Sequence, residues 1–407
     1  MNNEIPYVES LPAHWSVIQN RFLFQYDGEK VGEASAQYQL LSLTTAGVKE
    51  RDINAMGGKV PASYDNYQTV RKGQMVFCLF DLDCSAVFSG ISNYDGMITS
   101  AYDVFSSTGR MDNAYADYWF KYVFSNRYYK MFSKSIRYTI TGDMFRSLKT
   151  PVPPVDEQRR IASFLLEQET KVDALIANVQ AQIEKLKAYK QSVITEVVTK
   201  GLDPSVPMKD SGVEWIEKIA DTFRIMRLKN VAHILDQYRK PITADQRNQD
   251  SEVLYDYYGA SGVIDKIDGY TIDDDVMLIG EDGANLRMRN LPLMYEVHGK
   301  AWINNHAHIL KPKKTVLFYY LFYALEGLDI NPYITGSAQP KLNQENLKVI
   351  AIPVPSLEIQ AKIVDYIVER HRKIDHLIAI KQTKIDKLNA YKKSLIYEYV
   401  TGKKEVP

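Results

Sequence analysis

The chain has 407 residues, enough for two to three domains, and its 50 lysine and arginine residues are balanced by 50 acidic residues. Bulk charge therefore gives no sign of a polyanionic partner. Two cysteines, Cys78 and Cys84, form neither a disulfide framework nor a paired metal-ligand spacing, which is typical of reduced thiols in a cytosolic protein. No stretch approaches 18 apolar residues and the N-terminus has no signal-peptide pattern, so we expect a soluble, cytoplasmic protein without a membrane partner.

The first 150 residues mix strand and helix patterns. Alternating apolar and polar residues predict strands at 38–43 and 74–80, separated by clusters of glycine, aspartate and asparagine. A helical pattern follows at 114–135. We therefore expect an α+β domain over residues 1–150.

Residues 151–200 predict one long helix. Pro151-Val152-Pro153 ends the preceding strand, and Asp156 is a candidate for the residue that caps the helix. Apolar residues then recur at spacings of three and four, which is the 3.5-residue period of a coiled-coil seam. The seam consists of Val172, Ile176, Val179, Ile183, Leu186, Val193 and Val197, with Lys190 at one of its positions.

The same organisation returns after a linker at residues 201–223 that is rich in proline, glycine and small polar residues. Residues 224–352 again mix both patterns, with a predicted strand at 276–279 and a helix at 315–325. Residues 353–407 predict a second long helix, for which Ser356 is the candidate cap. Its seam consists of Ile374, Ile378, Ile385, Leu388, Leu395 and Tyr399, with Lys381 and Lys392 at two further positions.

The two halves are copies of one another. Gln158 in the first long helix corresponds without a gap to Gln360, 202 residues later, whereas Trp15 corresponds to Phe223 at an offset of 208. The chain is therefore a tandem duplication whose second half has lost six residues, and its first ten residues correspond to the linker. Two helices of about 44 residues span roughly 65 Å. We expect them to separate two globular modules; the alternative is a helical hairpin that closes one core.

Corresponding loops before the two long helices are the first candidates for a binding surface. Each places small polar residues before a basic or amide side chain and a short helix, which Thr141 and Asn343 are expected to cap. Backbone amides in such loops suit a phosphate, and basic side chains suit nucleic acid. The alternative is a purely structural turn. The candidate DNA-binding residues are Arg137, Tyr138, Thr139, Gln339 and Lys341.

A second polar cluster occupies residues 279–289 and 302–308. Its amide and guanidinium groups are suited to the bidentate hydrogen bonds that distinguish base edges. His306 and His308 have a metal-ligand spacing, but no cysteine lies nearby, and a buried strand with hydrogen-bonded imidazoles is favoured over a metal site. The candidate DNA-binding residues of this cluster are Arg287, Arg289, Asn304 and Asn305.

The sequence indicates no catalytic site. Neither a Gly-x-x-x-x-Gly-Lys phosphate loop nor a Gly-x-Gly-x-x-Gly motif is present. Asn331-Pro332-Tyr333 is similar to a motif of adenine methyltransferases, but it lacks one proline and no cofactor loop precedes it. Glu281 and Asp282 have no lysine near them in the sequence to complete a nuclease motif. We therefore expect a non-catalytic chain with no metal and no cofactor of its own.

Several runs resemble the specificity subunit of type I restriction–modification systems. They are the Pro-Val-Pro openings of both long helices, Gly-Ser-Ala-Gln-Pro-Lys-Leu-Asn at 336–343, Glu-Asp-Gly-Ala-Asn at 281–285 and Asn-Asn-His-Ala-His at 304–308. The resemblance covers nearly the whole chain. It implies that residues 1–150 and 224–352 are target recognition domains, each for one half of a bipartite double-stranded DNA sequence. It also implies that the long helices form an antiparallel coiled coil that sets the distance between the half-sites.

The resemblance implies partners as well. Two methylation subunits would dock on the chain with S-adenosylmethionine and the adenine-methylating chemistry, and motor-nuclease restriction subunits would join for DNA cleavage. The first mixed segment departs from the pattern, because its residues 78–90 lack the Glu-Asp-Gly loop and Arg137-Tyr138-Thr139 replaces Gln-Pro-Lys. The residues themselves leave another class open, namely a protein-interaction scaffold built on a long coiled coil that binds no DNA.

Overall fold

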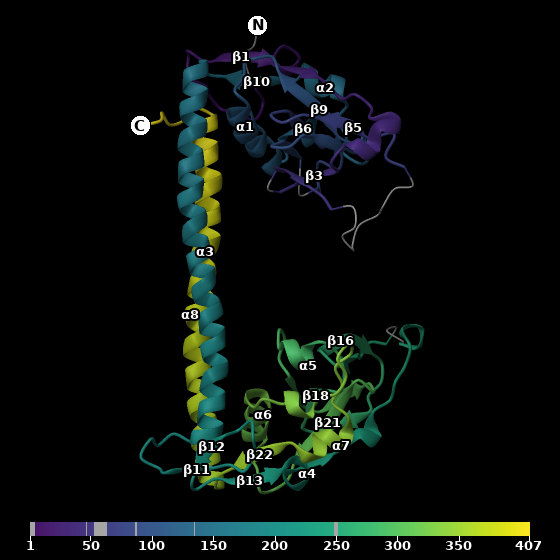
Figure 1. Cartoon of the computed structure of the whole chain (residues 1–407), viewed down its shortest axis with the longest axis vertical. Coiled ribbons are helices and arrows are strands. Elements are labelled where there is room, and N and C mark those ends of the chain that lie inside the picture. Colours follow the sequence, from purple (N-terminus) through teal and green to yellow (C-terminus); the bar gives the residue numbers. More distant parts are fainter. Residues whose placement is uncertain (1–4, 46, 53–62, 86–87, 134, 248–250) are drawn as a thin grey trace. The chain divides into compact units, whose positions relative to one another are not determined.

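A computed structural model describes residues 5–45, 47–52, 63–85, 88–133, 135–247 and 251–407 of the chain (Figure 1). The chain divides into two compact units. The first comprises residues 1–179 and 383–407, and the second comprises residues 180–382. Each unit therefore contains one mixed segment together with a part of each long helix. We call residues 1–150 the first mixed segment and residues 224–352 the second mixed segment.

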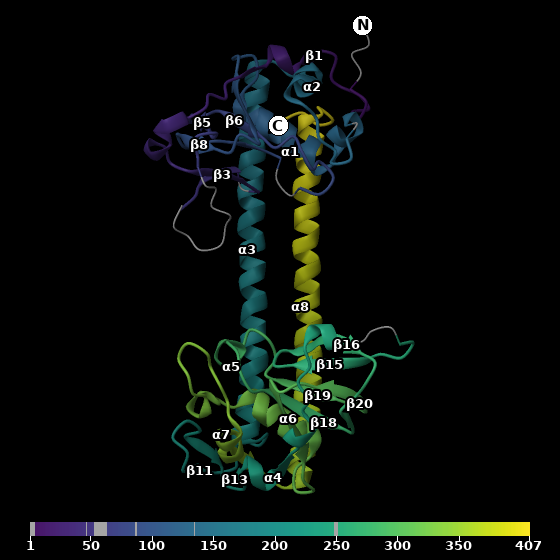
Figure 2. The ribbon, with the colours of Figure 1, turned by 90° about the vertical axis from the view of Figure 1, so that its right-hand side faces the viewer.

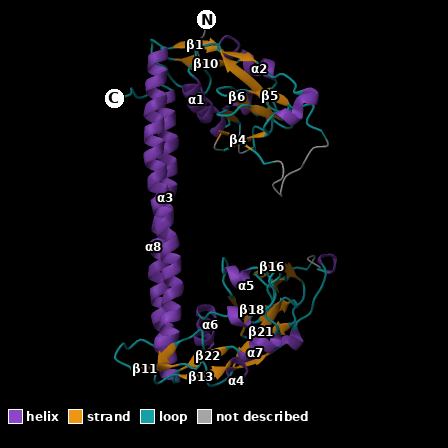
Figure 3. Cartoon of the chain, in the orientation of Figure 1, coloured by secondary structure: helices purple, strands orange, loops and turns teal. Residues whose placement is uncertain are grey.

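The first mixed segment is built on antiparallel strands (Figure 3). Its largest sheet has the strand order β2-β9-β6-β7, and smaller sheets pair β1 with β10, β3 with β4 and β5 with β8. The strands are β1 Ser16–Gln19, β2 Phe24–Tyr26, β3 Leu41–Thr44, β4 Gly47–Glu50, β5 Gln68–Val70, β6 Met75–Phe77, β7 Ser89–Ile91, β8 Gly96–Ile98, β9 Asp103–Ser107 and β10 Lys149–Val152. The two strands predicted from the sequence are β3 and β6, each shorter than expected.

Aromatic side chains form the core of this segment. Helix α1 (Asn113–Ser125) and helix α2 (Gly142–Ser147) pack on the sheet. The ring of Phe77 lies 4.8 Å from that of Phe120 and 4.7 Å from that of Phe145, and all three side chains are buried. The predicted helix at 114–135 is interrupted at Arg127, whose backbone is left-handed with φ 59°. Both cysteines are free, Cys78 being buried and Cys84 exposed.

The second mixed segment contains two four-stranded sheets. Their strand orders are β14-β21-β18-β19, which is antiparallel, and β16-β15-β20-β17, in which β15 and β20 are parallel. The elements are β13 Arg224–Arg227, α4 Leu228–Val231, β14 Ala232–Ile234, β15 Tyr255–Gly259, β16 Gly262–Ile267, β17 Ile272–Asp273, β18 Val276–Gly280, α5 Asn285–Met288, β19 Met294–Val297, β20 Lys300–Ile303, β21 Ala307–Pro312, α6 Phe318–Gly327, α7 Gln344–Val349 and β22 Ala351–Val354. The predicted strand at 276–279 and helix at 315–325 correspond to β18 and α6. The linker forms a hairpin of β11 Met208–Asp210 and β12 Lys218–Ala220.

The long helices are α3 (Val155–Lys200) and α8 (Leu357–Val400), which lie side by side in Figure 2. Their seam residues are buried or half-buried as predicted, with Ile183 only 2% exposed and Ile374 4% exposed. Ser356 directly precedes α8 and its hydroxyl accepts the N–H of Ile359, whereas the predicted cap Asp156 lies inside the first turn of α3.

Two ion pairs define the direction of packing. In the second unit, Lys190 Nζ lies 2.8 Å from Asp375, and in the first unit, Lys392 Nζ lies 2.7 Å from Asp173. Each pair is the 202-residue counterpart of the other with the two helices exchanged. The helices are therefore antiparallel, and the fold is α+β with a pseudo-twofold repeat.

Polar contacts that join each mixed segment to its long helices are also repeated. Gln158 is fully buried at the start of α3, where its side chain accepts the N–H of Asp112 and donates to the carbonyl five residues earlier. Gln360 does the same at the start of α8, where it accepts the N–H of Leu317. The duplicated sequence thus forms the same buried contact twice. Removal of either side-chain amide would leave buried backbone N–H and carbonyl groups without a hydrogen-bond partner.

Candidate nucleic-acid interface

In the second mixed segment, residues 335–341 form a closed loop before α7. The backbone N–H of Thr335 donates to the carbonyl of Lys341, and the N–H of Lys341 donates back to Thr335. Gly336 has φ 78°, and a methyl group there would lie 2.3 Å from the carbonyl oxygen of Gln339, so the turn requires glycine. As predicted, Asn343 caps α7 by accepting the N–H of Asn346. The loop presents Gln339 and Lys341 to solvent.

Three separate runs of sequence meet at the end of β18. The N–H of Glu281 donates to the carbonyl of His306, the N–H of Leu342 donates to the carbonyl of Glu281, and the N–H of Gly283 donates to Pro340. The Glu-Asp-Gly loop, the Asn-Asn-His turn and the loop before α7 are therefore held together by backbone hydrogen bonds. The three motifs therefore form one surface, although they lie far apart in the chain.

Charged side chains fill the space beneath this surface. The Glu281 carboxylate contacts Lys341 Nζ at 3.2 Å and also accepts from the guanidinium of Arg239. Arg239 in turn lies 3.3 Å from Asp236, and Asp236 accepts from His308 Nδ1 at 2.7 Å. The other ring nitrogen of His308, which is 1% exposed, faces the Leu342 carbonyl at 2.7 Å.

The contacts of this network shift the pKa values of its carboxylates. The two nitrogens of His308 face oxygen atoms of Asp236 and of the Leu342 carbonyl. Burial by itself would raise the pKa of Asp236, but its hydrogen bonds with His308, Ile309 and Gln344 outweigh burial and lower the pKa. Burial is likewise outweighed at Glu281, where hydrogen bonds with Arg239 and Lys341 lower the pKa.

The candidate residues of this segment fall into two groups. Gln339, Lys341 and Asn305 are exposed around the joined loops. Asn304 is 5% exposed and its side chain accepts the N–H of His306, so it shapes the turn rather than facing solvent. Arg287 is exposed as well, and its guanidinium donates to the carbonyls of Ile334 and Gly336.

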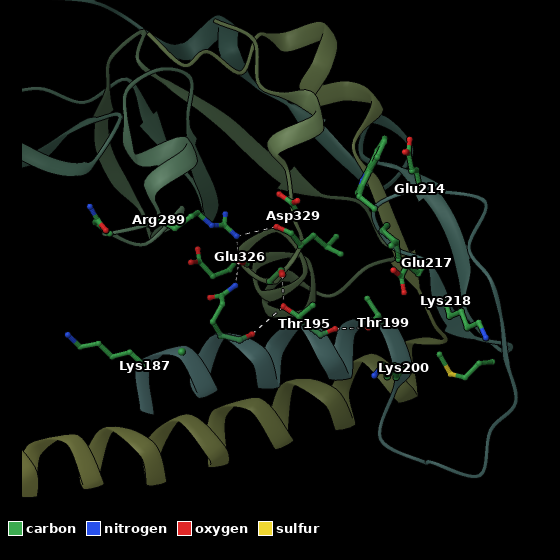
Figure 4. Close-up of a pocket in the computed structure, with 18 of the residues that line it drawn as sticks. Lys187, Thr195, Thr199, Lys200, Glu214, Glu217, Lys218, Arg289, Glu326 and Asp329 are labelled. Atoms are coloured by element: carbon green, nitrogen blue, oxygen red, sulfur yellow. Dashed lines mark hydrogen bonds between the residues drawn. The ribbon is translucent and has the colours of Figure 1, made fainter. Parts of the chain in front are cut away.

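Arg289 lies away from these loops, beside a cavity of about 1280 Å³ in the second unit. Figure 4 shows it at the C-terminal end of α6, where its guanidinium donates to the carbonyls of Glu326 and Leu328. Gln191 and Thr195 of α3 donate to carbonyls of the same helix end. These polar groups satisfy the carbonyls that every helix leaves unpaired at its C-terminus. The position of Arg289 therefore supports a structural role.

In the first mixed segment, residues 133 and 135–139 lie in the corresponding loop. The Ser133 hydroxyl donates to the carbonyl of Thr139, and the N–H of Thr139 donates to the Ser135 hydroxyl. Tyr138 adopts a left-handed conformation with φ 45° beneath the ammonium group of Lys130, which lies 4.1 Å from its ring. Thr141 caps α2 as predicted.

Arg137 is an exposed charged residue of this loop. Its guanidinium donates from Nε and Nη2 to both carboxylate oxygens of Asp81, at 3.0 and 2.8 Å. As in the second segment, backbone hydrogen bonds join the loop after the central strand, here β6, to the loop before the short helix. The N–H of Asp81 donates to the Arg137 carbonyl, and the N–H of Ile140 donates to the Leu79 carbonyl. Arg137, Tyr138 and Thr139 thus lie on a loop that is joined to the loop carrying Asp81.

Sequence reasoning missed the acidic partners of these loops. The first mixed segment lacks a Glu-Asp-Gly motif, yet Asp81 lies in the corresponding loop. Asp236 and Arg239 were also missed, because they are 42 or more residues away from Glu281 and His308. The only available signal was a charged residue beside a predicted strand end, which is too common to identify a site.

Neither a metal centre nor a membrane span emerges from the described part of the chain. No group of three or more histidine, cysteine, aspartate or glutamate side chains is arranged there to hold a metal. His306 and His308 instead pair with different carboxylates, those of Asp282 and Asp236. Among the same residues, no helix is both long and apolar enough to cross a bilayer.

Comparison with known proteins finds similarity to type I restriction-system specificity subunits. A family model described as the type I restriction modification DNA specificity domain matches residues 220–400. The type I restriction enzyme MjaVIII specificity subunit of Methanocaldococcus jannaschii is 25% identical over 281 residues, which is 64% of this chain and 63% of that protein. A Haemophilus influenzae protein provisionally named a type I restriction enzyme specificity subunit is 34% identical over 137 residues, 34% of each chain. The matches thus span between 34% and 63% of these relatives' lengths.

Two solved structures share the fold. A chain from work on complex assembly and conformational transition of the type I R-M system aligns with a TM-score of 0.67 at 15% identity, covering 98% of this chain and 100% of that chain. The HsdS subunit of Thermoanaerobacter tengcongensis aligns with a TM-score of 0.50 at 15% identity, covering 98% of both chains. Similarity at this level of identity concerns the fold alone.

Proposed function

We propose that the chain is a specificity subunit of a type I restriction–modification system, which recognises a bipartite double-stranded DNA sequence and catalyses no reaction itself. Residues 1–150 and 224–352 are the two target recognition domains, one for each half-site. Residues 151–200 and 353–407 contain the spacer helices, and residues 201–223 are the linker.

One observation carries this proposal. Both mixed segments join a loop after a central strand to a loop before a short helix, through equivalent backbone hydrogen bonds to Leu79 and Glu281. The exposed side chains on that common frame differ, with Arg137 in one segment and Gln339 and Lys341 in the other. A repeated frame with different polar side chains suits recognition of two different half-sites, because base edges are distinguished by their pattern of donors and acceptors.

An exchange of one segment tests the proposal directly. The second mixed segment is replaced by that of a relative with another target, and methylated adenines are mapped by long-read sequencing in cells that contain the partner subunits. We expect one half of the modified sequence to change while the other half stays the same. A change in both halves would contradict the modular proposal, and methylation independent of this chain would favour the protein scaffold.

We propose that the long helices bind two methylation subunits, which carry S-adenosylmethionine. Motor-nuclease restriction subunits would then bind to this assembly. Exposed apolar residues on these helices support this. Leu175 and Tyr391 lie in the first unit, and their 202-residue counterparts Leu377 and Tyr189 lie in the second, all about half exposed. Each stands three residues after a seam position, so within each unit the two apolar residues share one flank of the antiparallel pair. One apolar pair in each unit suits one partner subunit per unit.

A further inference from the structure

Both mixed segments place a carboxylate behind the basic side chain of the loop before the short helix. In the first segment Asp81 holds Arg137 through two hydrogen bonds, and in the second Glu281 lies 3.2 Å from Lys341. The two pairs do not derive from one ancestral pair by direct copying. Arg137 corresponds to Gln339 at the 202-residue offset, and Glu281 corresponds to Leu79. The same arrangement has therefore been built from different positions of the repeated frame.

The acid is the deeper member of each pair. The side chain of Asp81 is 27% exposed and that of Arg137 is 72% exposed. Glu281 is 15% exposed and Lys341 is 53% exposed. A ligand that approaches from solvent thus meets the cation first, with the carboxylate beneath it.

This order has two physical consequences. The carboxylate limits the directions in which the cation can point, since a bidentate pair fixes the plane of a guanidinium group. In Arg137 it engages Nε and Nη2 and leaves Nη1 to donate elsewhere. The negative charge also weakens attraction to any phosphate, while it affects a hydrogen bond to a neutral base edge much less.

We propose that Asp81 and Glu281 are positioning residues for sequence discrimination, which orient Arg137 and Lys341 toward base edges and suppress their pairing with phosphates. This inference rests on the proposed DNA-recognition function. It assigns one such residue to each half-site, so each half-site serves as the internal control for the other.

The experiment uses the chain in complex with its methylation subunits and the variants Asp81→Asn and Glu281→Gln. Binding is measured on a duplex with the mapped target, on duplexes with either half-site scrambled, and on unrelated DNA, over a range of salt. We expect Asp81→Asn to reduce discrimination at the half-site of the first segment by roughly tenfold, and Glu281→Gln to do so at the other half-site only. Affinity for unrelated DNA should rise, with a salt slope steeper by about one phosphate contact.

The variants Asp81→Glu and Glu281→Asp keep the charge and are expected to restore most of the discrimination. Loss of discrimination at both half-sites by a single substitution would overturn the inference. A lower affinity of Asp81→Asn or Glu281→Gln for unrelated DNA would also overturn the inference, because a merely structural role of the carboxylate predicts loss of all binding. The proposed function fails separately, and the inference with it, if the unmodified complex does not distinguish its target from unrelated DNA.

Discussion

The charged side chains of the second mixed segment have separate structural and surface roles, although they are of similar residue types. Asp236, Arg239, Glu281 and His308 form a network below the joined loops, while Gln339 and Lys341 lie above it. Buried charges are tolerated only when paired and hydrogen-bonded. The network therefore acts as a rigid base for the exposed residues, and its members should affect stability more than the exposed residues do.

Acid sensitivity is one consequence of this network. The pKa of Asp236 is lower in the folded chain than the ordinary value near 4, so its stabilising contribution is complete above about pH 4 and is lost as the pH falls further. We expect Asp236→Asn to cost about 3 kcal/mol at neutral pH, since it removes a buried carboxylate that pairs with Arg239 and is hydrogen-bonded to His308 and Ile309. It should also flatten the acid side of the stability profile. Urea unfolding from pH 7 to pH 3 measures both, with the exposed Glu252→Gln as the control. An unchanged acid profile would contradict the assignment.

Arg289 and Lys341 provide a matched comparison of the two roles. We expect Arg289→Ala to lower unfolding free energy by about 2 kcal/mol, because the Leu328 carbonyl loses its side-chain donor and the Glu326 carbonyl keeps only that of Gln191. Half-site preference should then persist at a temperature where the variant is folded. Lys341→Ala should leave the melting temperature nearly unchanged and weaken recognition of the second half-site. Thermal melting and binding to the mapped target distinguish these outcomes. An Arg289→Ala variant that melts normally but loses half-site preference would mean that Arg289 contacts DNA.

Among the elements, the long helices were predicted closely and the short ones were not. A seam repeated over many turns identifies a helix whatever surrounds it, and the buried Ile183 and Ile374 follow that period. Strands β3 and β6 are only a few residues long, and their ends depend on the neighbours with which they pair. The break at Arg127, which ends the predicted first-segment helix, likewise has no strong marker in the sequence.

The apolar flank of α3 and α8 supports a prediction about assembly. Combined Leu175→Ala and Tyr391→Ala should remove one bound methylation subunit, because they delete the exposed apolar pair of the first unit. The matched variant with Leu377→Ala and Tyr189→Ala should remove the other. Native mass spectrometry of the reconstituted complex counts the subunits. Leu166→Ala, at an exposed residue off this flank, is the control, and equal loss in the control would rule out a specific docking surface.

At the scale of the whole molecule, the proposed distance between half-sites follows from helix length. Insertion of seven residues at corresponding positions of α3 and α8 keeps the seam in register and lengthens each helix by about 10 Å. We expect the unspecified spacer in the methylated sequence to grow by about three base pairs, while both half-sites stay the same. Long-read mapping of methylated adenines tests this. An unchanged spacer would mean that the helices do not set the distance. Insertion in α3 alone is the control, because it leaves the two helices unequal in length.

The sequence by itself determined the duplication, the two coiled-coil helices and the loops that carry the candidate residues. Each of these rests on local spacing or on comparison of one half with the other, which need no knowledge of distant neighbours. Only the tertiary structure decided which candidates are exposed and which support the fold, as with Lys341 and Arg289. It also revealed Asp81 behind Arg137, 56 residues away in the chain. The physical reason is that a side chain's role depends on which charges and carbonyls it meets, and those contacts arise only when strands and loops from different parts of the chain pack together.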